Sequence, residues 1–436
     1  MTAIESVTSL SKKERDKEVR RVVASSYFGS MLEYYDFLLY GTAAALVFGP
    51  VFFSNLSPTA GTIASLGTFA AGYLARPFGG IVFGHFGDRL GRKSMLMISM
   101  AMMGGASVLI GMVPPAEMIG SWGAVLLILL RLIQGIAIGG EWGGAVLMSL
   151  EHADPKKRGF LTSFTNAGAP SGSLLGTLVM AVVAWLPEED FMSWGWRIPF
   201  LLSAILVALG LFIRSRVSES PIFVAALEKD KEAPKREMPL LQILKKPRAL
   251  VIVTLSCVGL FALKATFSTF GINFAVNGGT ERSDTLFSFA VAQFIAIFAV
   301  LAFARISDRF GRRPVMAAGL ALYIAMSFPI FALLGSGTTA LVTLAFVMAF
   351  LCHAAVYGPM AAYVSEQFPT SSRYTGSSVA FQTGSIVAGL SPMAAAALYA
   401  GSGNSTTTSI FMMGICAISL VALWRASETC DNDLTR

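Results

Sequence analysis

Apolar runs of about 20 residues follow one another along almost the whole chain. Twelve are expected, at residues 24–48, 60–84, 94–113, 122–150, 161–185, 196–213, 249–275, 284–306, 314–333, 340–364, 374–400 and 406–425. A helix of about this length crosses a hydrocarbon core of about 30 Å. Only 14% of the residues are charged, whereas a soluble domain carries roughly 25%. The sequence therefore predicts an all-α membrane protein with twelve transmembrane helices.

A short cationic loop occurs twice, at equivalent places in the two halves of the chain. Residues 84–93 read GHFGDRLGRK, and residues 304–313 read ARISDRFGRR. A second repeated pair has the same glutamate-to-arginine spacing in both halves: Glu151 with Arg158, and Glu366 with Arg373. Parallel internal repeats mark one class of secondary transporter. We therefore expect two pseudo-symmetric six-helix halves, at residues 23–213 and 249–425.

Lys and Arg are concentrated in alternate loops, and this sets the expected orientation. The basic segments are residues 1–22, 89–93, 156–158, 214–248 and 309–313. The loops near residues 50–60, 113–121, 334–340 and 400–406 hold no Lys or Arg. Cytoplasmic loops are enriched in these residues. We expect a plasma-membrane protein with a cytoplasmic N-terminal tail (1–22), linker (214–248) and C-terminal tail (426–436).

Other classes of function leave no sign in the sequence. The net charge of +7 follows the positive-inside distribution and does not form a nucleic-acid-binding face. Metalloprotease motifs, nucleophile elbows and phosphate-binding loops are absent from the sequence. The four cysteines form no close pair: Cys257, Cys352, Cys416 and Cys430. We expect no enzyme activity, no metal and no cofactor, with the lipid bilayer and a small molecule as partners.

Several motifs together resemble the major facilitator superfamily. The repeated loop is similar to its signature Gly-x-x-x-Asp-Arg-x-Gly-Arg-Arg/Lys, and residues 131–141 resemble its fourth-helix pattern. EYYDF at 33–37, WRIPF at 196–200 and RYTG at 373–376 are similar to the metabolite:proton symporter branch, with Tyr34 in place of Trp. That branch includes carriers of shikimate, 2-oxoglutarate, citrate, and proline or betaine. The resemblance implies proton-coupled transport by alternating access, with spans one, four, seven and ten lining a central cavity.

The resemblance also implies a gate at the cytoplasmic ends of the spans. A helix N-terminus carries unsatisfied N–H groups and a partial positive charge. Asp88 would dock at the start of span eleven, and Asp308 at the start of span five. Arginines of the repeated loops would pair with Glu151 and Glu366; the alternative is that these loops only set the topology. The expected gating residues are Asp88, Arg89, Arg92, Asp308, Arg309, Arg312, Glu151, Arg158, Glu366 and Arg373.

Ionisable side chains inside the apolar runs are the main candidates for coupling and binding. A charge at a helix centre costs about 3 kcal/mol on insertion scales, so each must pair or face a wet cavity. Glu33, Asp36 and Tyr40 share one face of the first span by their spacing. The proton-coupling candidates are Glu33, Asp36 and Glu141. The substrate-binding candidates are Arg131, Lys264, Tyr40, Gln134, His353, Tyr357, Asn166 and Gln382.

Structural alternatives remain open for some of these residues. Arg131 and Glu141 would then form a static ion pair, His353 would be hydrogen-bonded packing, and Asn166 and Gln382 would be helix contacts. Cationic groups suit a carboxylate, so we expect a monomeric carrier that takes up a small organic acid with a proton. The alternatives are uptake of a zwitterionic osmolyte such as proline or betaine, and efflux by proton antiport.

Overall fold

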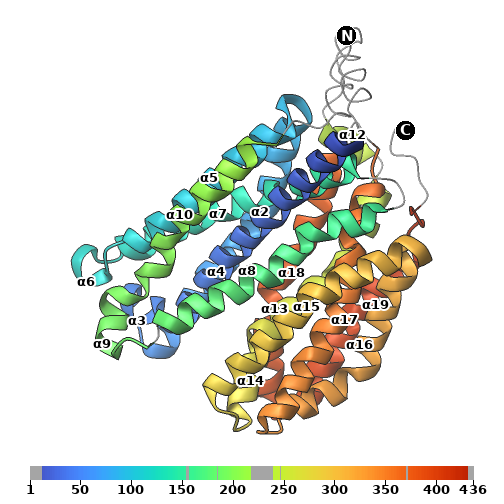
Figure 1. Cartoon of the computed structure of the whole chain (residues 1–436). Coiled ribbons are helices and arrows are strands. Elements are labelled where there is room, and N and C mark those ends of the chain that lie inside the picture. Colours follow the sequence, from blue (N-terminus) through green and yellow to red (C-terminus); the bar gives the residue numbers. More distant parts are fainter. Residues whose placement is uncertain are drawn as a thin grey trace.

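The computed structural model describes residues 12–153, 157–183, 185–217, 239–245, 247–369 and 372–430. Within them, the side chains of residues 12–16, 45–46, 58–59, 62–63, 66, 88–90, 151–152 and 239 lie outside the description. Every regular element in the described part is a helix. Figure 1 shows these helices as two bundles that lie side by side, with both termini at the same end.

The first bundle is built from the N-terminal half of the chain. Its elements are α2 (Lys12–Leu46), α3 (Phe48–Phe52), α4 (Pro58–Leu90), α5 (Arg92–Met112), α6 (Ala116–Ile119), α7 (Trp122–His152), α8 (Arg158–Val183), α9 (Glu188–Asp190), the π-helical turn η2 (Phe191–Gly195) and α10 (Arg197–Ser215). The second bundle contains α12 (Pro239–Lys245), α13 (Pro247–Ser268), α14 (Phe270–Asn277), α15 (Arg282–Phe310), α16 (Arg312–Leu334), α17 (Thr339–Glu366), α18 (Arg373–Ser402) and α19 (Ser405–Arg425).

The long helices account for the twelve expected spans. Ten segments of the described chain are long and apolar enough to cross a membrane, with α13 and α14 together forming one of them. The other two spans correspond to α2 and α4, which have 35 and 33 residues. Most of the helices are longer than the apolar runs; α2 begins at Lys12, inside the expected N-terminal tail, because polar residues continue the helix beyond the hydrocarbon region.

The two repeated loops are tight connections that depend on glycine. Gly91 joins α4 to α5 with φ 102°, and Gly311 joins α15 to α16 with φ 93°. Glycine adopts a positive φ without the steric cost that a Cβ atom brings. Gly91 and Gly311, at equivalent positions of the two loops, therefore set a sharp turn that places the loop arginines at the ends of the helices.

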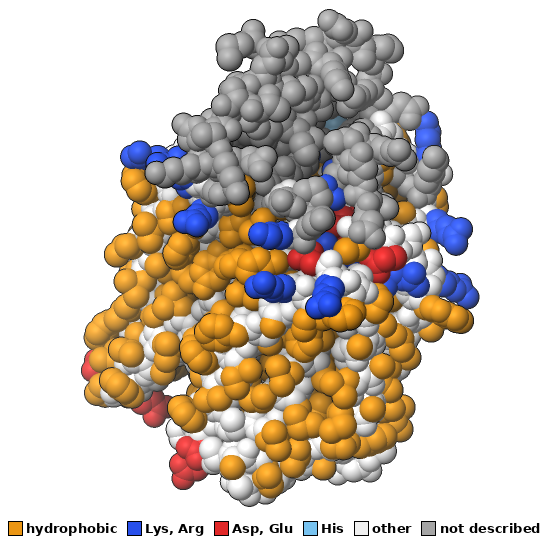
Figure 2. Space-filling view, turned by 45° about the vertical axis from the view of Figure 1, so that its right-hand side comes forward, with side chains coloured by type: hydrophobic (Ala, Val, Ile, Leu, Met, Phe, Trp, Pro, Cys, Tyr) orange, Lys and Arg blue, Asp and Glu red, His pale blue; other side chains and the backbone are white. Residues whose placement is uncertain are grey.

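The two bundles meet mainly at the end that carries the termini. Helix α8 packs against α15 and α17, and α18 packs against α4 and α7. At Gly84 of α4, a Cβ atom would lie 2.8 Å from the Cα atom of Thr375, so glycine permits this close approach. Trp142 stacks on Phe381 across the same interface, with ring centroids 3.5 Å apart. At the other end, α3 and α14 pack within their own bundles, and Figure 2 shows the surface hollowed between two lobes there.

Charged side chains divide between the two ends of the molecule. Figure 2 shows Lys and Arg near the termini with some acidic residues among them, acidic residues without Lys or Arg at the opposite end, and a broad hydrophobic surface between the two ends. The acidic end includes Glu188, Glu189 and Asp190, which form α9. This distribution follows the loop pattern from which the sequence predicts cytoplasmic termini.

Candidate functional site

The two carboxylates of α2 lie buried in the first bundle. Glu33 and Asp36 are each 2% exposed. Ser203 of α10 donates a hydrogen bond to Oδ1 of Asp36 at 2.5 Å, and Ser107 of α5 also contacts this carboxylate. Oε2 of Glu33 has no hydrogen-bond partner among the described residues. Neither carboxylate forms a salt bridge with a described Lys or Arg.

Arg131 of α7 lies among aromatic rings close to these carboxylates. Its Nη1 donates to Oε1 of Gln134 at 3.0 Å, and Nε2 of Gln134 donates to Oγ of Ser107 at 2.7 Å. The guanidinium carbon lies 4.2 Å from the ring centroid of Tyr40 and 4.8 Å from that of Phe37. The structure therefore brings Arg131, Gln134 and Tyr40 together, and Ser107 links this group to the carboxylate of Asp36.

Glu141 pairs with a residue that the sequence analysis did not select. Nη1 and Nη2 of Arg214, on α10, both donate to its carboxylate, and Ser99 donates to Oε2 at 2.9 Å. Both charged residues are buried. The alternative of a static Arg131–Glu141 pair is therefore wrong. Helix α10 continues to Ser215, so Arg214 lies in the last turn of a helix, although the sequence predicts the start of the linker (214–248) there.

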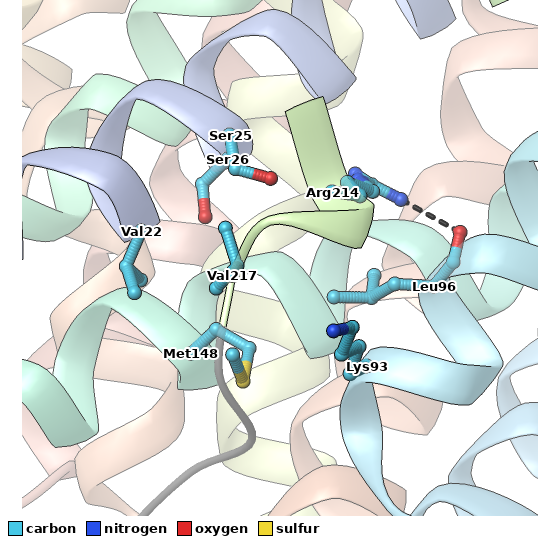
Figure 3. Close-up of a pocket in the computed structure, with 8 residues that line it drawn as sticks. All are labelled: Val22, Ser25, Ser26, Lys93, Leu96, Met148, Arg214 and Val217. Carbon is cyan, nitrogen blue, oxygen red and sulfur yellow. Dashed lines mark hydrogen bonds between the residues drawn. The ribbon is translucent and has the colours of Figure 1, made fainter. Parts of the chain in front are cut away.

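A separate pocket lies beside this ion pair, at the end of the first bundle that carries the N-terminus. Figure 3 shows its lining: Val22, Ser25, Ser26, Lys93, Leu96, Met148, Arg214 and Val217. Nη1 of Arg214 donates to the carbonyl oxygen of Leu96 at 2.7 Å, and Nζ of Lys93 donates to that of Ser215 at 2.9 Å. The candidate substrate-binding residues do not line this pocket.

A polar cluster joins the two bundles through α2, α13 and α17. The hydroxyl groups of Tyr34 and Tyr357 lie 3.4 Å apart. Nζ of Lys264 lies 4.7 Å from the ring centroid of Tyr34, and the rings of His353 and Tyr357 are 5.2 Å apart. The structure therefore brings three of the predicted substrate-binding residues together around Tyr34, where the symporter branch has Trp.

The two predicted amides bind backbone groups across the interface between the bundles. Asn166 of α8 accepts from Nε1 of Trp142 at 3.0 Å and donates to the carbonyl oxygen of Tyr357 at 2.5 Å. Gln382 of α18 donates to the carbonyl oxygen of Ile138 at 3.3 Å. These hydrogen bonds match the helix-contact alternative for both residues.

The second of the two repeated loops docks on the first bundle. The carboxylate of Asp308 accepts hydrogen bonds from the N–H groups of Gly159 and Phe160, both at 2.8 Å. These residues form the first turn of α8. Arg312 donates to Asp308 at 2.6 Å and to Glu366 at 3.4 Å. The contact between Asp308 and the start of span five is the one that the sequence analysis expects.

The other expected gating residues differ from one another in burial and in contacts. Arg309 is exposed, lies 5.6 Å from the ring of Phe310, and forms no salt bridge with the described acidic side chains. Among the described loop arginines, Arg312 is the one that pairs with Glu366. A charged side chain at the surface gains little from such a pair. Arg92, Arg158 and Arg373 are buried at the loop ends of the bundles. The side chains of Asp88, Arg89 and Glu151 lie outside the described part of the chain.

Two further features were missed by the sequence analysis. Arg76 of α4 is 3% exposed, and its signal in the sequence is a charge inside an apolar run. Glu428 accepts hydrogen bonds from the N–H groups of Arg312 and Arg313, each at 3.0 Å. Thr429 donates to Glu366 at 2.8 Å. The described end of the polar C-terminal tail thus caps α16 beside the Asp308 contact.

Comparisons with known proteins agree along most of the chain. The model described as Major Facilitator Superfamily matches residues 26–392 and 277–429. The shikimate transporter of Escherichia coli (strain K12) is 39% identical over 406 residues, which cover 92% of each chain. The proline/betaine transporter of Salmonella typhimurium is 31% identical and covers 96% of this chain and 85% of its own. The proton:xylose symporter XylE, bound to 6-bromo-6-deoxy-D-glucose, has a TM-score of 0.75 at 19% identity, covering 97% and 98% of the two chains.

Proposed function

The chain belongs to the major facilitator superfamily, and from this premise we propose that it takes up a small organic acid together with a proton. It is a multi-pass membrane transporter and not an enzyme. The observation that carries the proposal is that Arg131, Glu33 and Asp36 are buried in the first bundle. Lys264 of the second bundle lies beside Tyr34, on the same helix as the two carboxylates. The similarity to a shikimate transporter supports a carboxylate as the substrate.

Proton binding and substrate binding would be coupled through the charges of these buried groups. When a proton neutralises Asp36 or Glu33, the cations lose a negative neighbour and gain affinity for a substrate carboxylate. Coupling between two binding sites is reciprocal, so the bound substrate would also favour the proton. A membrane potential of 100 mV would add about 2.3 kcal/mol for each net charge moved inward. In this scheme the proton is the coupling ion and no other cofactor takes part.

Alternating access would use the contacts at the end that carries the termini. We place that end in the cytoplasm, because Lys and Arg gather there. The Asp308 contact and its counterpart at Asp88 would hold the two bundles together while the opposite side is open. Release of these contacts would then open the cytoplasmic side, and the carrier would complete this cycle as a monomer.

A zwitterionic osmolyte is the second candidate substrate. The similarity to a proline/betaine transporter favours it, as does the presence of both carboxylates and cations in the buried region. Efflux by proton antiport would use the same groups in the opposite direction. These candidates differ in what accumulates inside a vesicle and in which direction the substrate moves when a proton gradient is imposed.

The test is uptake into proteoliposomes that contain the purified protein. Labelled shikimate, 2-oxoglutarate, proline and betaine would be compared under an inside-alkaline pH gradient, with and without a protonophore. We expect a carboxylate to accumulate and the protonophore to abolish its accumulation. Accumulation of proline or betaine alone would favour the second candidate. Proton-driven export from loaded vesicles would indicate antiport.

A further inference from the structure

We propose that Arg76 is a second cationic ligand of the substrate, and that Arg76 and Arg131 together bind one carboxylate group. The inference rests on the proposed uptake of an organic acid. It also states which end of the substrate each bundle would bind. Arg76 lies on α4 and Arg131 on α7. These helices pack side by side in the first bundle.

The ring of Phe37, on α2, sets an upper limit on the distance between the two guanidinium groups. The guanidinium carbon of Arg76 is 4.7 Å from the centroid of this ring, and that of Arg131 is 4.8 Å from it. The two carbons are therefore at most 9.5 Å apart. Guanidinium N–H groups approach carboxylate oxygens to about 2.7–2.9 Å, so two guanidiniums on either side of one carboxylate span roughly 8 Å.

Both guanidinium groups have donors without partners. Nε and Nη2 of Arg76, and Nε and Nη2 of Arg131, form no hydrogen bond with the described residues, although both side chains are buried. Arg76 is held instead by aromatic rings, with Tyr73 at 4.3 Å from its guanidinium carbon. Contacts of this kind only partly offset the cost of removing a charged group from water. The pair of arginines therefore offers four unused donors to an anion.

The neighbouring carboxylates of the chain do not fill this role. Asp36 is bound by Ser203 and contacts Ser107. Glu33 lies one helical turn before Phe37 on α2 and forms no salt bridge with either arginine. A carboxylate can accept about four hydrogen bonds, which suits the unpaired donors of both arginines. An incoming carboxylate would replace the ring contacts and gain stronger, charge-assisted hydrogen bonds.

This assignment defines how the substrate would be oriented between the two bundles. Its carboxylate would lie in the first bundle, and the opposite end would face Tyr34, Tyr357 and Lys264, which offer hydroxyl and ammonium groups. The rings of Phe37 and Tyr73 would contact the apolar body between them. The class of substrate that fits is a small monocarboxylate with hydroxyl groups at its far end.

The test is equilibrium binding to the purified full-length protein, so that a defect in transport does not obscure it. The probes are shikimate, lactate and benzoate, each beside its neutral primary amide. The variants are Arg76→Gln and Arg76→Lys, with Arg216→Gln as the control. Arg216 also lies on an aromatic ring, that of Phe212 at 5.0 Å, but at the exposed end of α10. Thermal unfolding of each variant checks that it is folded.

For the carboxylate that binds the parent protein, Arg76→Gln should weaken binding at least tenfold and leave binding of the amide unchanged. Arg76→Lys should weaken carboxylate binding three- to tenfold, because an ammonium group lacks the planar fork. Arg216→Gln should bind like the parent. Equal loss for acid and amide, or parent-like binding by either Arg76 variant, would overturn the inference. If the parent protein binds none of the three acids, these carboxylates are not its substrates. The proposed role of Arg76 as their ligand is then rejected as well.

Discussion

Asp308 of α15 lies against the first turn of α8, where its Oδ2 accepts the N–H of Phe160 at 2.8 Å. Its other oxygen accepts the N–H of Gly159 at the same distance. One carboxylate of the second bundle therefore satisfies two of the N–H groups that a helix start leaves unpaired. The partial positive charge at that end adds to the attraction. The contact joins the two bundles at the end that we place in the cytoplasm.

Asp308→Asn should weaken the closed cytoplasmic side. The amide keeps one acceptor oxygen but loses the charge, and a hydrogen bond to a charged group contributes about 1.5–3 kcal/mol. We expect a cysteine placed at Ser378, which is buried on α18, to react roughly tenfold faster with a thiol reagent, since 1.4 kcal/mol is a tenfold change.

The matched control is Asp284→Asn, which makes the same change at the other end of α15. Asp284 accepts a hydrogen bond from Thr339 at 2.7 Å and does not contact the first bundle through this bond. Its variant should leave the reactivity at Ser378 unchanged. Equal reactivity in the Asp308 variant and the parent would show that the Asp308 contact does not hold the cytoplasmic side closed.

The buried pair of Glu141 and Arg214 leads to a prediction about stability. Arg214→Gln leaves the carboxylate of Glu141 buried without its cation, a change that typically costs about 3–5 kcal/mol. The melting temperature of the purified protein should fall clearly. Adding Glu141→Gln should recover much of the loss, because no uncompensated charge remains. A single variant as stable as the parent would contradict a structural role for this pair.

The sequence predicts features that depend on spacing within one helix or on the internal repeat. Arg131 and Gln134 meet because they are three residues apart on α7. The docking of Asp308 follows from the repeated loop and from the positive end of a helix. The twelve spans follow from the apolar runs, since hydropathy identifies the segments that can enter a bilayer.

Pairings between helices could not be predicted in the same way. Glu141 and Arg214 are 73 residues apart, and their contact depends on how α7 and α10 rotate against each other. Gly29 of α2 also faces this pair, where a Cβ atom would collide with the guanidinium group of Arg214. Arg76 carries a visible signal, a charge inside an apolar run, but its lack of a hydrogen-bond partner at Nε and Nη2 appears only in the folded chain.

Lys264→Gln should raise the substrate concentration needed for half-maximal uptake. The ammonium group lies 4.7 Å from the ring of Tyr34, whose hydroxyl is 3.4 Å from that of Tyr357. It would supply a charged donor to the far end of the substrate. We expect a three- to thirtyfold increase, with expression unchanged. Uptake assays at varied substrate concentration measure it. If the concentration for half-maximal uptake is unchanged, the substrate does not contact Lys264 of α13.

Labelling of single cysteines tests the orientation of the chain. Ser57 and Gly401 are exposed at loops that we place outside the cell. In a Cys430→Ser background, cysteines at these positions should react with an impermeant maleimide added to intact cells. The native Cys430, which is partly exposed, should react only after the membrane is permeabilised. The opposite pattern would contradict cytoplasmic termini.

Substrate-induced proton flux is the most direct test of proton-coupled uptake through the α2 carboxylates. Proteoliposomes containing a trapped pH dye would receive the transported carboxylate, and counterflow exchange of the same substrate would be measured in parallel. The parent should acidify the vesicle interior as substrate enters. Asp36→Asn or Glu33→Gln should abolish this acidification while counterflow continues, because a neutral side chain resembles the protonated state. Substrate entry without acidification in the parent, or undiminished acidification in both variants, would contradict the account.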